Sequence, residues 1–345
     1  MVTNNSQRSA LPDILKGIAV IRMIVVHLME VFATAEIYQS QLGKLLVFLA
    51  GPPGAPLFMI IMGFFIAKSS KGLQVSIYRG FKLIVWGLLL NIGMNFHLLL
   101  KIISGSVHLN PWPYVFGVDI LFLAGFSLII MALFKRIFKD RIYIYVLLAV
   151  LFALPGQILP DYTGGSEWLK YVFAFFKSSE AWSYFPLFPW ATYPVAGYVF
   201  YLLNTKYQFH DITARGLIYI AASLFLVLAL SFSWGFKIAA SAELYYHHSL
   251  VFAIWVFTLI AFWVILIHLF TRNNESIKPL GYLKWAGRYV TNFYVFQWLL
   301  IGNIGTAIYK TQSGLAMLVW FVVITASASV LVYVYRIIKT RVGFL

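Results

Sequence analysis

The chain has 345 residues, of which 61% are hydrophobic and 11% are charged, and its formal net charge is +15. Soluble domains carry roughly 25% charged residues, and a soluble fold of this length could not hide so much apolar surface from water, so the composition excludes a soluble protein. The basic residues lie in short segments between apolar runs, which is typical of membrane proteins rather than of nucleic-acid binding.

Apolar runs of about 20 residues, each long enough to cross the hydrocarbon of a bilayer, recur along the whole chain. Residues 17–32 and the small residues after them imitate a signal peptide, but Arg22 and His27 interrupt the apolar core, so we interpret this segment as the first helix. We predict an all-α, polytopic membrane protein in which one bundle of about ten transmembrane helices forms a single domain over residues 1–345. The predicted spans are residues 13–33, 48–67, 80–100, 113–134, 142–158, 185–203, 216–234, 249–271, 289–309 and 316–338.

The charges of the loops predict the orientation of this bundle. With the N-terminus in the cytoplasm, 19 of the 26 lysines and arginines, Arg8 among them, fall in cytoplasmic segments, and six fall in outer loops. The short cytoplasmic loops of membrane proteins are enriched in these residues. The count therefore predicts that both termini are cytoplasmic. The expected location of this multi-pass protein is the inner (cytoplasmic) membrane of the cell.

The first predicted span is the richest in ionisable residues, which are rare at membrane depth and mark cavities or partners. Lys16 and His27 are eleven residues apart, so they share one face of the helix with a rise of about 16 Å between them. Glu30 lies one turn beyond His27, near enough to orient or polarise it. Histidine suits proton chemistry at physiological pH, and the alternative is that His27 only hydrogen-bonds a neighbouring helix.

Three further cations have two interpretations each. Arg22 points away from the face of Lys16 and His27, and either forms a structural pair, with Asp119 as one candidate, or contacts a substrate. Arg79 and Lys82 share one face at the cytoplasmic start of the third span, where they could bind phosphate groups or simply anchor the helix.

Other polar residues at membrane depth are candidates either for lining a site or for hydrogen bonds between helices. These are Asn91, Asn95, Asn292 and Gln297. Residues 51–56 and 185–190, the latter ending in Trp190, are rich in proline and predict irregular backbone, which is tolerated at this depth where it lines a cavity or packs inside protein. The chain has no cysteine, and His247 and His248 would point apart on a helix, so no metal site is predicted.

Together these residues resemble a known group of membrane enzymes. Residues 13–19 (Asp-Ile-Leu-Lys-Gly-Ile-Ala) followed by His27 resemble the first helix of membrane acyltransferase family three, which has an Arg-Gly-(Ile/Leu)-Ala motif and a histidine eleven residues after the arginine. The residues Arg79-x-x-Lys82 are similar to its Arg-x-x-Arg motif. Further resemblance to the wider transmembrane acyltransferase superfamily, including its heparan-glucosaminide N-acetyltransferase-like branch, lies in residues 54–65, 185–190 and 287–297.

The chain departs from this pattern in two respects. Lys16 and Lys82 stand where the family usually has arginine, which keeps the charge but loses the bidentate geometry of the guanidinium. The heparan-type enzymes are associated with a histidine in the first outer loop, and residues 34–47 contain none. The resemblance therefore implies a catalytic role for His27 alone among the histidines.

The resemblance implies an acyl-CoA-dependent O- or N-acyltransferase with no permanently bound cofactor. Acyl-CoA, in the first place acetyl-CoA, would be the co-substrate, and a hydroxyl or amine of an extracytoplasmic glycan or cell-envelope molecule would be the acceptor. His27 and Glu30 would be catalytic, with either direct transfer or an acyl-histidine intermediate. The phosphates would lie near Lys16, Arg79, Lys82 and Arg288, and the remaining lining candidates would be Asp13, Asn91, Asn95, Trp190, Asn292 and Gln297.

Two other functions remain open at this point. A transporter or flippase for a lipid-linked or sugar substrate would use paired broken helices, and the proline-rich segments at 51–56 and 185–190 are a weak sign of them. A receptor or assembly scaffold is the third interpretation. The expected partners are acyl-CoA, the acceptor and the lipid bilayer. Nucleic acid is not expected as a partner, and the sequence leaves a homodimer open.

Overall fold

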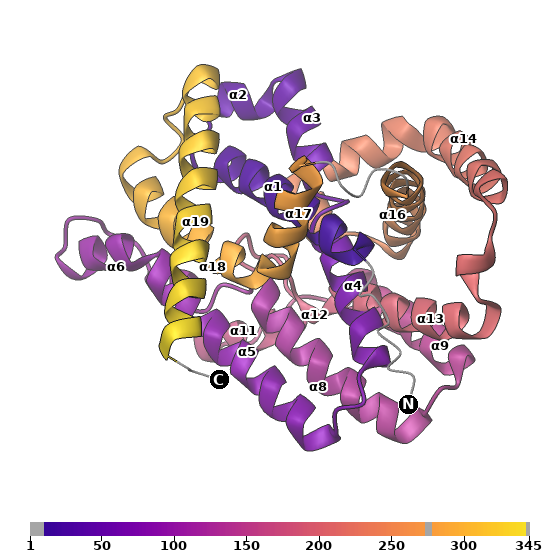
Figure 1. Ribbon diagram of the computed structural model, residues 1–345. Coiled ribbons are helices and arrows are strands. Elements are labelled where there is room, and N and C mark those ends of the chain that lie inside the picture. Colours follow the sequence, from indigo (N-terminus) through magenta and orange to yellow (C-terminus); the bar gives the residue numbers. More distant parts are fainter. Residues whose placement is uncertain (1–9, 273–277, 343–345) are drawn as a thin grey trace.

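The computed structural model describes residues 10–272 and 278–342 (Figure 1). Within these ranges every regular element is a helix, and the β-bridges are two isolated ones. Arg8, one of the cations in the charge count, lies outside the described residues. The elements are α1 (Leu11–Val31), α2 (Ala35–Gln39), α3 (Gln41–Ala50), α4 (Ala55–Lys68), α5 (Leu73–Met94), α6 (Phe96–Ile103), α7 (Trp112–Val115), α8 (Ile120–Phe138), α9 (Ile142–Ala153), α10 (Pro155–Ile158), α11 (Glu167–Ala174), α12 (Leu187–Trp190), α13 (Thr192–Tyr207), the 3₁₀ helix η1 (Phe209–Asp211), α14 (Ala214–Ala239), α15 (Ala242–Tyr246), α16 (Leu250–Thr271), α17 (Lys278–Arg288), α18 (Val290–Ile308) and α19 (Gly314–Val342).

Six helical stretches of the described residues are long and apolar enough to cross a membrane, in agreement with the predicted all-α membrane fold. They are Gln41–Lys68, Leu73–Met94, Ile120–Phe138, Ala214–Ala239, Leu250–Thr271 and Gly314–Arg341, and Ile142–Ile158 is a shorter apolar stretch. The other predicted spans centre on α1, α13 and α18, which are also helical. α1 carries four charged side chains and α13 has only 16 residues. Ten crossings and cytoplasmic termini stay predictions.

A turn divides the second apolar stretch into two helices. α3 ends at Ala50, α4 begins at Ala55, and residues 51–54 (Gly-Pro-Pro-Gly) form the turn between them. The prolines have no N–H group to donate, so one continuous helix cannot form here. We expected this segment to open a span, but it lies inside the apolar stretch, because the ten residues of α3 precede it.

α1 lies in the middle of the bundle and packs against α3, α4, α17, α18 and α19 (Figure 1). Its closest neighbour is α17: a Cβ atom on Gly17 would collide with the backbone carbonyl of Leu283, and one on Gly287 would collide with that of Asp13. The two helices therefore cross with their backbones in contact, as small residues allow in membrane bundles. This crossing fixes the N-terminal end of α1. Farther out, α5 packs on α8, α13 on α4 and α9, and α14 on α16.

The C-terminal end of α1 is joined to the connection between α18 and α19. The N–H groups of Lys310 and Gln312 donate to the carbonyls of Val31 and Phe32, each at 2.9 Å. The charge count predicts that the connection after α1 and the connection between α18 and α19 both lie on the outer side of the membrane. Their hydrogen bonds close that end of the bundle beside the last turn of α1.

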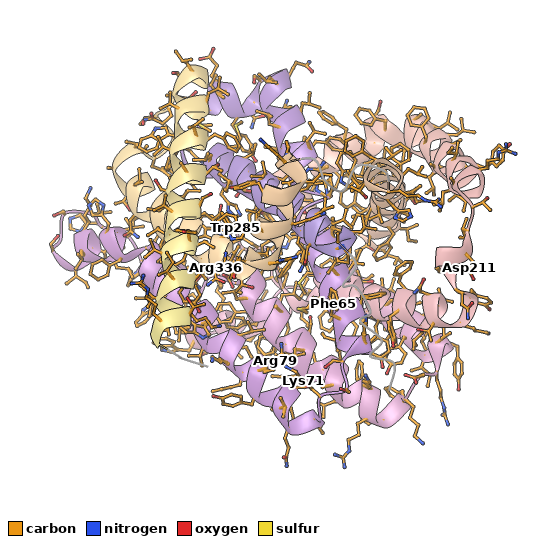
Figure 2. All side chains as sticks on the ribbon, viewed as in Figure 1. Phe65, Lys71, Arg79, Asp211, Trp285 and Arg336 are labelled. Carbon is orange, nitrogen blue, oxygen red and sulfur yellow. The ribbon has the colours of Figure 1, made fainter. Side chains whose placement is uncertain are left out.

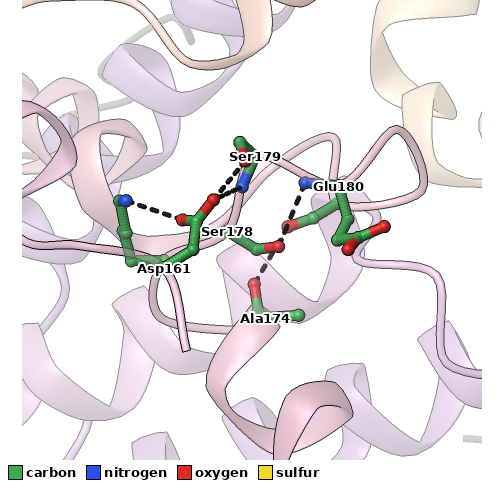
Figure 3. Close-up of polar contacts among 7 residues, drawn as sticks. Asp161, Ala174, Ser178, Ser179 and Glu180 are labelled. Carbon is green, nitrogen blue, oxygen red and sulfur yellow. Dashed lines mark hydrogen bonds and ion pairs between the residues drawn. The ribbon is translucent and has the colours of Figure 1, made fainter. Parts of the chain in front are cut away.

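The long connection between α10 and α12 is held together by its own polar contacts (Figure 3). The Asp161 carboxylate accepts hydrogen bonds from Lys177 Nζ at 2.6 Å, from the Ser179 N–H at 3.2 Å and from the Ser179 hydroxyl. Val118 N–H, just before α8, donates to the carbonyl of Trp182 at 3.0 Å. The connection therefore packs on the bundle, next to the start of α8.

Candidate active site

A cavity of about 80 Å³ lies between α1, α3, α4, α8, α15 and α18. Small residues leave the space for it, since six lining positions are glycine or alanine, and four of these six belong to the turn between α3 and α4 or flank it. This agrees with the expectation that irregular backbone at membrane depth lines a cavity. The lining residues are Ala19, Met23, Val26, His27, Glu30, Val47, Ala50, Gly51, Gly54, Ala55, Phe58, Ile120, Leu121, Phe185, Ala242, Tyr245, Tyr246, Val290, Thr291 and Tyr294.

His27 lies on the wall of this cavity and is held by three residues of α18. Its Nδ1 lies 2.7 Å from Nε2 of Gln297, its ring stacks on Trp298 with the centroids 3.9 Å apart, and Tyr294 approaches edge-on at 6.3 Å. The side chain of His27 is 7% exposed. Because Gln297 occupies Nδ1, Nε2 is the ring nitrogen that is available to a substrate in the cavity.

Gln297 is fully buried and is the residue that orients His27. Among the described residues its Oε1 has no hydrogen-bond partner. An amide rotated by half a turn would exchange Oε1 and Nε2 at the His27 ring, so the orientation of Gln297 determines which ring nitrogen of His27 carries the proton.

Glu30 lines the same cavity one turn beyond His27. Its Oε1 accepts a hydrogen bond from the hydroxyl of Tyr246 on α15 at 3.0 Å. Glu30 is half-buried and its hydrogen-bond partner is Tyr246, whereas the partner of the His27 ring is Gln297. The expectation that Glu30 orients His27 is therefore wrong, because Gln297 has that position. Because both residues line the cavity, His27 and Glu30 bring a base and a carboxylate to one small and mostly apolar space.

An ion cluster lies at the N-terminal end of α1, about 16 Å along the helix from His27. Asp13 is 2% exposed, its Oδ1 lies 2.9 Å from Lys16 Nζ, and its Oδ2 lies 3.4 Å from Nε of Arg288 on α17. Lys16 Nζ also lies 5.9 Å from the ring centroid of Phe65. The structure thus brings together three of the predicted site residues, with the carboxylate between the two cations.

Arg79 and Lys82 are exposed on α5, which packs against α8. Arg79 lies in the same part of the structure as Lys71, toward the start of α5 (Figure 2). Within the described ranges no hydrogen bond or ion pair joins either residue to the cluster of Asp13, Lys16 and Arg288. The two cations therefore face the surroundings of the bundle rather than the ion cluster.

The predicted asparagines on α5 hold the segment that precedes α8. Asn91 Nδ2 donates to the carbonyls of Val115 at 3.0 Å and Gly117 at 2.7 Å, and Asn95 Nδ2 donates to that of Tyr114 at 3.1 Å. This is the interhelical hydrogen bonding that was the alternative to site lining. As described, the cavity wall does not include either residue.

Trp190 and Asn292 lie next to the cavity wall. Trp190 is fully buried, and its Nε1 donates to the carbonyl of the lining residue Tyr246 at 2.7 Å. Asn292 is half-buried and follows the lining residue Thr291 in the first turn of α18. Trp190 therefore supports the wall from behind.

Arg22 and Asp119 do not form the pair that was one interpretation of the sequence. Asp119 caps the start of α8 by accepting from the N–H of Leu121 at 2.8 Å, and it accepts from the Tyr294 hydroxyl at 3.0 Å. The guanidinium of Arg22 lies over the ring of Trp263 on α16, 4.2 Å from its centroid. The predicted pairing of Arg22 with Asp119 is wrong, because Asp119 caps α8 and its carboxylate oxygens accept hydrogen bonds from α8 and α18.

The tyrosines of the cavity wall were not predicted from the sequence. Tyr245 and Tyr246 belong to α15, in a short connection between apolar runs, where aromatic residues usually indicate the membrane interface. His248 is also buried there, with Nε2 2.8 Å from the Tyr193 hydroxyl and Nδ1 2.8 Å from the Tyr245 carbonyl. No spacing in the sequence distinguishes this folded connection from an interfacial loop.

The comparisons with known proteins point to one family. The model of the heparan-alpha-glucosaminide N-acetyltransferase catalytic family matches residues 8–229, which is more than half of the chain. The matched range contains α1 with Lys16 and His27, and it ends before α18, which carries Gln297. No curated protein and no solved structure matches the chain.

Proposed function

The chain belongs to the heparan-alpha-glucosaminide N-acetyltransferase catalytic family, and on that premise we propose that it transfers an acyl group from cytoplasmic acyl-CoA to a hydroxyl or amine on the outer side of the inner membrane. Acetyl is the first acyl group to test, and a glycan or another cell-envelope molecule is the proposed acceptor. The observation that carries the proposal is the position of His27, which lines a buried cavity while Gln297 holds its Nδ1.

The donor side of the proposal rests on α1. The cavity wall on this helix runs from Ala19 to Glu30 along one face, and the cluster of Lys16, Asp13 and Arg288 lies at its N-terminal end. We assign the phosphates of acyl-CoA to the cations of this cluster, where a guanidinium and an ammonium can donate to phosphate oxygens. The acyl-bearing arm would then follow α1 for about 16 Å and bring the thioester to His27. Arg79 and Lys82 add positive charge on the cytoplasmic side.

The reaction needs one base and returns the proton to the leaving group. As the acceptor oxygen or nitrogen bonds to the thioester carbonyl carbon, its proton passes to Nε2 of His27. The carbon–sulfur bond then breaks, and the coenzyme A thiolate takes that proton from His27. General base catalysis of this kind contributes roughly 10² to 10⁴-fold to a rate. The same nitrogen could instead attack the thioester to form an acyl-histidine intermediate.

For His27 to act at Nε2, its Nδ1 must carry the proton and donate it. The Gln297 carbonyl oxygen is the acceptor for that proton after a half-turn of the amide, and Oε1 is the Gln297 atom that has no partner among the described residues. Stacking on Trp298 keeps the ring in plane for this hydrogen bond. The arrangement supports His27 as a positioned base rather than a residue that only links two helices.

The test is binding and slow hydrolysis of acetyl-CoA by the purified full-length protein in detergent. We expect His27→Ala to bind acetyl-CoA but to lose hydrolysis, and Lys16→Ala and Arg79→Ala to weaken binding. His108→Ala is the matched control, because His108 is an exposed histidine in the connection after α6. A folded protein that binds neither acetyl-CoA nor another short acyl-CoA would contradict the proposal and favour a transporter or flippase.

A further inference from the structure

Arg22 is a charged residue of α1 that has no role in the proposed reaction. It lies about 140° around the helix from His27 and about 120° from Lys16. Its guanidinium carbon is 4.2 Å from the centroid of the Trp263 ring on α16. Both Arg22 Nη1 and Trp263 Nε1 are buried, and neither has a hydrogen-bond partner among the described residues. Two neighbouring donors, one from each helix, therefore lack an acceptor.

Within residues 10–272 and 278–342, no carboxylate balances the charge of Arg22 either. The acid once considered for it, Asp119, is bound to Tyr294 and the start of α8. A cation at membrane depth normally pairs with an anion or with carbonyl groups. The face of an indole attracts a guanidinium, but it does not accept the in-plane N–H groups. An oxyanion is a group that can accept from both donors and also balance the charge of Arg22.

Helix geometry places this pair in the cytoplasmic half of the predicted membrane. Helical side chains lean toward the N-terminus, so the long side chain of Arg22 carries its guanidinium about one turn toward the cytoplasmic end of α1. Trp263 lies eight residues before Thr271, the last residue of α16. Near Trp263 on the same helix, Leu266 is 38% exposed and Phe270 is 53% exposed. The pair therefore lies at the boundary between the bundle and the inner leaflet.

We propose that Arg22 and Trp263 bind the phosphate of an anionic phospholipid of the inner leaflet, held between α1 and α16. The guanidinium and the indole N–H supply the donors, and Leu266 and Phe270 supply apolar contact for the acyl chains. The phosphates of coenzyme A have the same chemistry, but they belong with Lys16, which lies on another face of α1. The face of Arg22 is turned toward α16, where Leu266 and Phe270 are exposed to the surroundings of the bundle. This site is independent of the proposed acyl transfer.

The experiment is native mass spectrometry of the full-length protein in detergent, with phosphatidylglycerol or phosphatidylcholine of equal chain length. The wild-type protein should retain phosphatidylglycerol more tightly than phosphatidylcholine. Arg22→Gln should lower the affinity for phosphatidylglycerol about tenfold or more, because a charge-assisted hydrogen bond is lost. Trp263→Phe, which removes only the N–H donor and part of the ring, should lower it about threefold. Arg215→Gln, which removes an exposed cation at the start of α14, is the control for non-specific attraction.

Three results would overturn the proposal. The wild-type protein could bind both lipids equally, or Arg22→Gln could lose no more affinity for phosphatidylglycerol than Arg215→Gln. In a parallel titration with coenzyme A, Arg22→Gln could lose coenzyme A and keep the lipid, which would assign the residue to the donor site. If Arg22→Gln does not fold, Arg22→Lys replaces it, since lysine keeps the charge without the planar fork. The proposal would likewise be contradicted if Arg22→Lys kept the wild-type preference for phosphatidylglycerol and Trp263→Phe kept the wild-type affinity for it.

Discussion

The imidazole of His27 lies at 28° to the indole of Trp298, with the ring centroids 3.9 Å apart. Trp298 follows Gln297 in α18, so one short stretch of that helix both stacks on the proposed base and contacts its Nδ1. α18 lies outside the residues that the family model matches. The proposed active site is therefore completed by the C-terminal third of the chain.

The first prediction concerns Gln297. Gln297→Leu should lower kcat about 10²-fold with little change in KM, because His27 loses the acceptor that fixes its tautomer. Gln297→Glu supplies a carboxylate that can accept from Nδ1 and should keep kcat within about tenfold of wild type. Steady-state kinetics of acetyl-CoA hydrolysis would measure both. Wild-type kcat in folded Gln297→Leu would show that His27 does not depend on Gln297.

The second prediction concerns the crossing of α1 and α17. Gly17→Ala should lower the free energy of unfolding by about 1–3 kcal/mol, because the added methyl group meets the backbone of Leu283. Gly281→Ala is the control in α17, where no described atom lies within 4 Å of the new Cβ. It should raise stability by about 0.5–1 kcal/mol, as alanine suits a helix better than glycine. Thermal unfolding in detergent would measure both, and equal shifts in Tm would contradict the tight crossing.

The third prediction compares a buried and an exposed carboxylate. Asp13→Asn should cost about 1–3 kcal/mol of stability, because Asp13 and Lys16 are largely buried. It should also raise the Kd for acetyl-CoA about tenfold, since Lys16 and Arg288 lose the group that holds them. Glu180→Gln breaks the exposed pair with Lys170 and should cost less than about 1 kcal/mol. Chemical denaturation and equilibrium binding distinguish the two variants. An unchanged Kd for acetyl-CoA in Asp13→Asn would show that the ion cluster is not part of the donor site.

The fourth prediction concerns the connection between α10 and α12, which Asp161 holds together. Burial alone would raise the pKa of Asp161, but hydrogen bonds from Lys177 and Ser179 outweigh it and hold that pKa below its usual range. A carboxyl group with a lowered pKa stabilises the fold above its unfolded pKa of about 3.9, and this contribution is lost as the pH falls through the folded value. Limited proteolysis of residues 159–186 should therefore accelerate below about pH 4 in the wild-type protein. In Asp161→Asn, cleavage should be fast at neutral pH as well. Equal resistance of the two proteins to proteolysis at pH 7 would contradict the prediction.

Features that depend on one helix could be predicted from the sequence. The shared face of Lys16 and His27 follows from helical periodicity, and the irregular backbone at residues 51–54 follows from its prolines. The helices α2 and α3 could not be predicted in this way. Residues 34–47 contain several polar side chains and were interpreted as an outer loop, whereas most of them form helices that lead into the apolar stretch of α4.

Contacts between distant segments account for most of what the sequence did not reveal. Gln297 lies 270 positions from His27, and Arg288 lies 275 positions from Asp13. Both pairs contain residues that the sequence marked as candidates, but nothing in the spacing joins them. Trp263 could not be predicted as the partner of Arg22, because an indole carries no formal charge that could be paired with a cation in the sequence. The helix-capping role of Asp119 explains why the one partner that charge matching offered for Arg22 does not pair with it.

The glycines and alanines that line the cavity would limit the length of the acyl chain that the proposed reaction accepts. A space made by missing side chains can be narrowed at many positions, but it can be widened only where a large residue lines it, as Met23 and Phe58 do. Each methylene that a pocket accepts or refuses changes selectivity by about 1–3 kcal/mol. Ala50→Val should therefore restrict turnover to acetyl-CoA, and Phe58→Ala should admit butyryl-CoA. Unchanged relative rates across acetyl-, propionyl- and butyryl-CoA would mean that residues outside this cavity determine the selectivity for acyl-chain length.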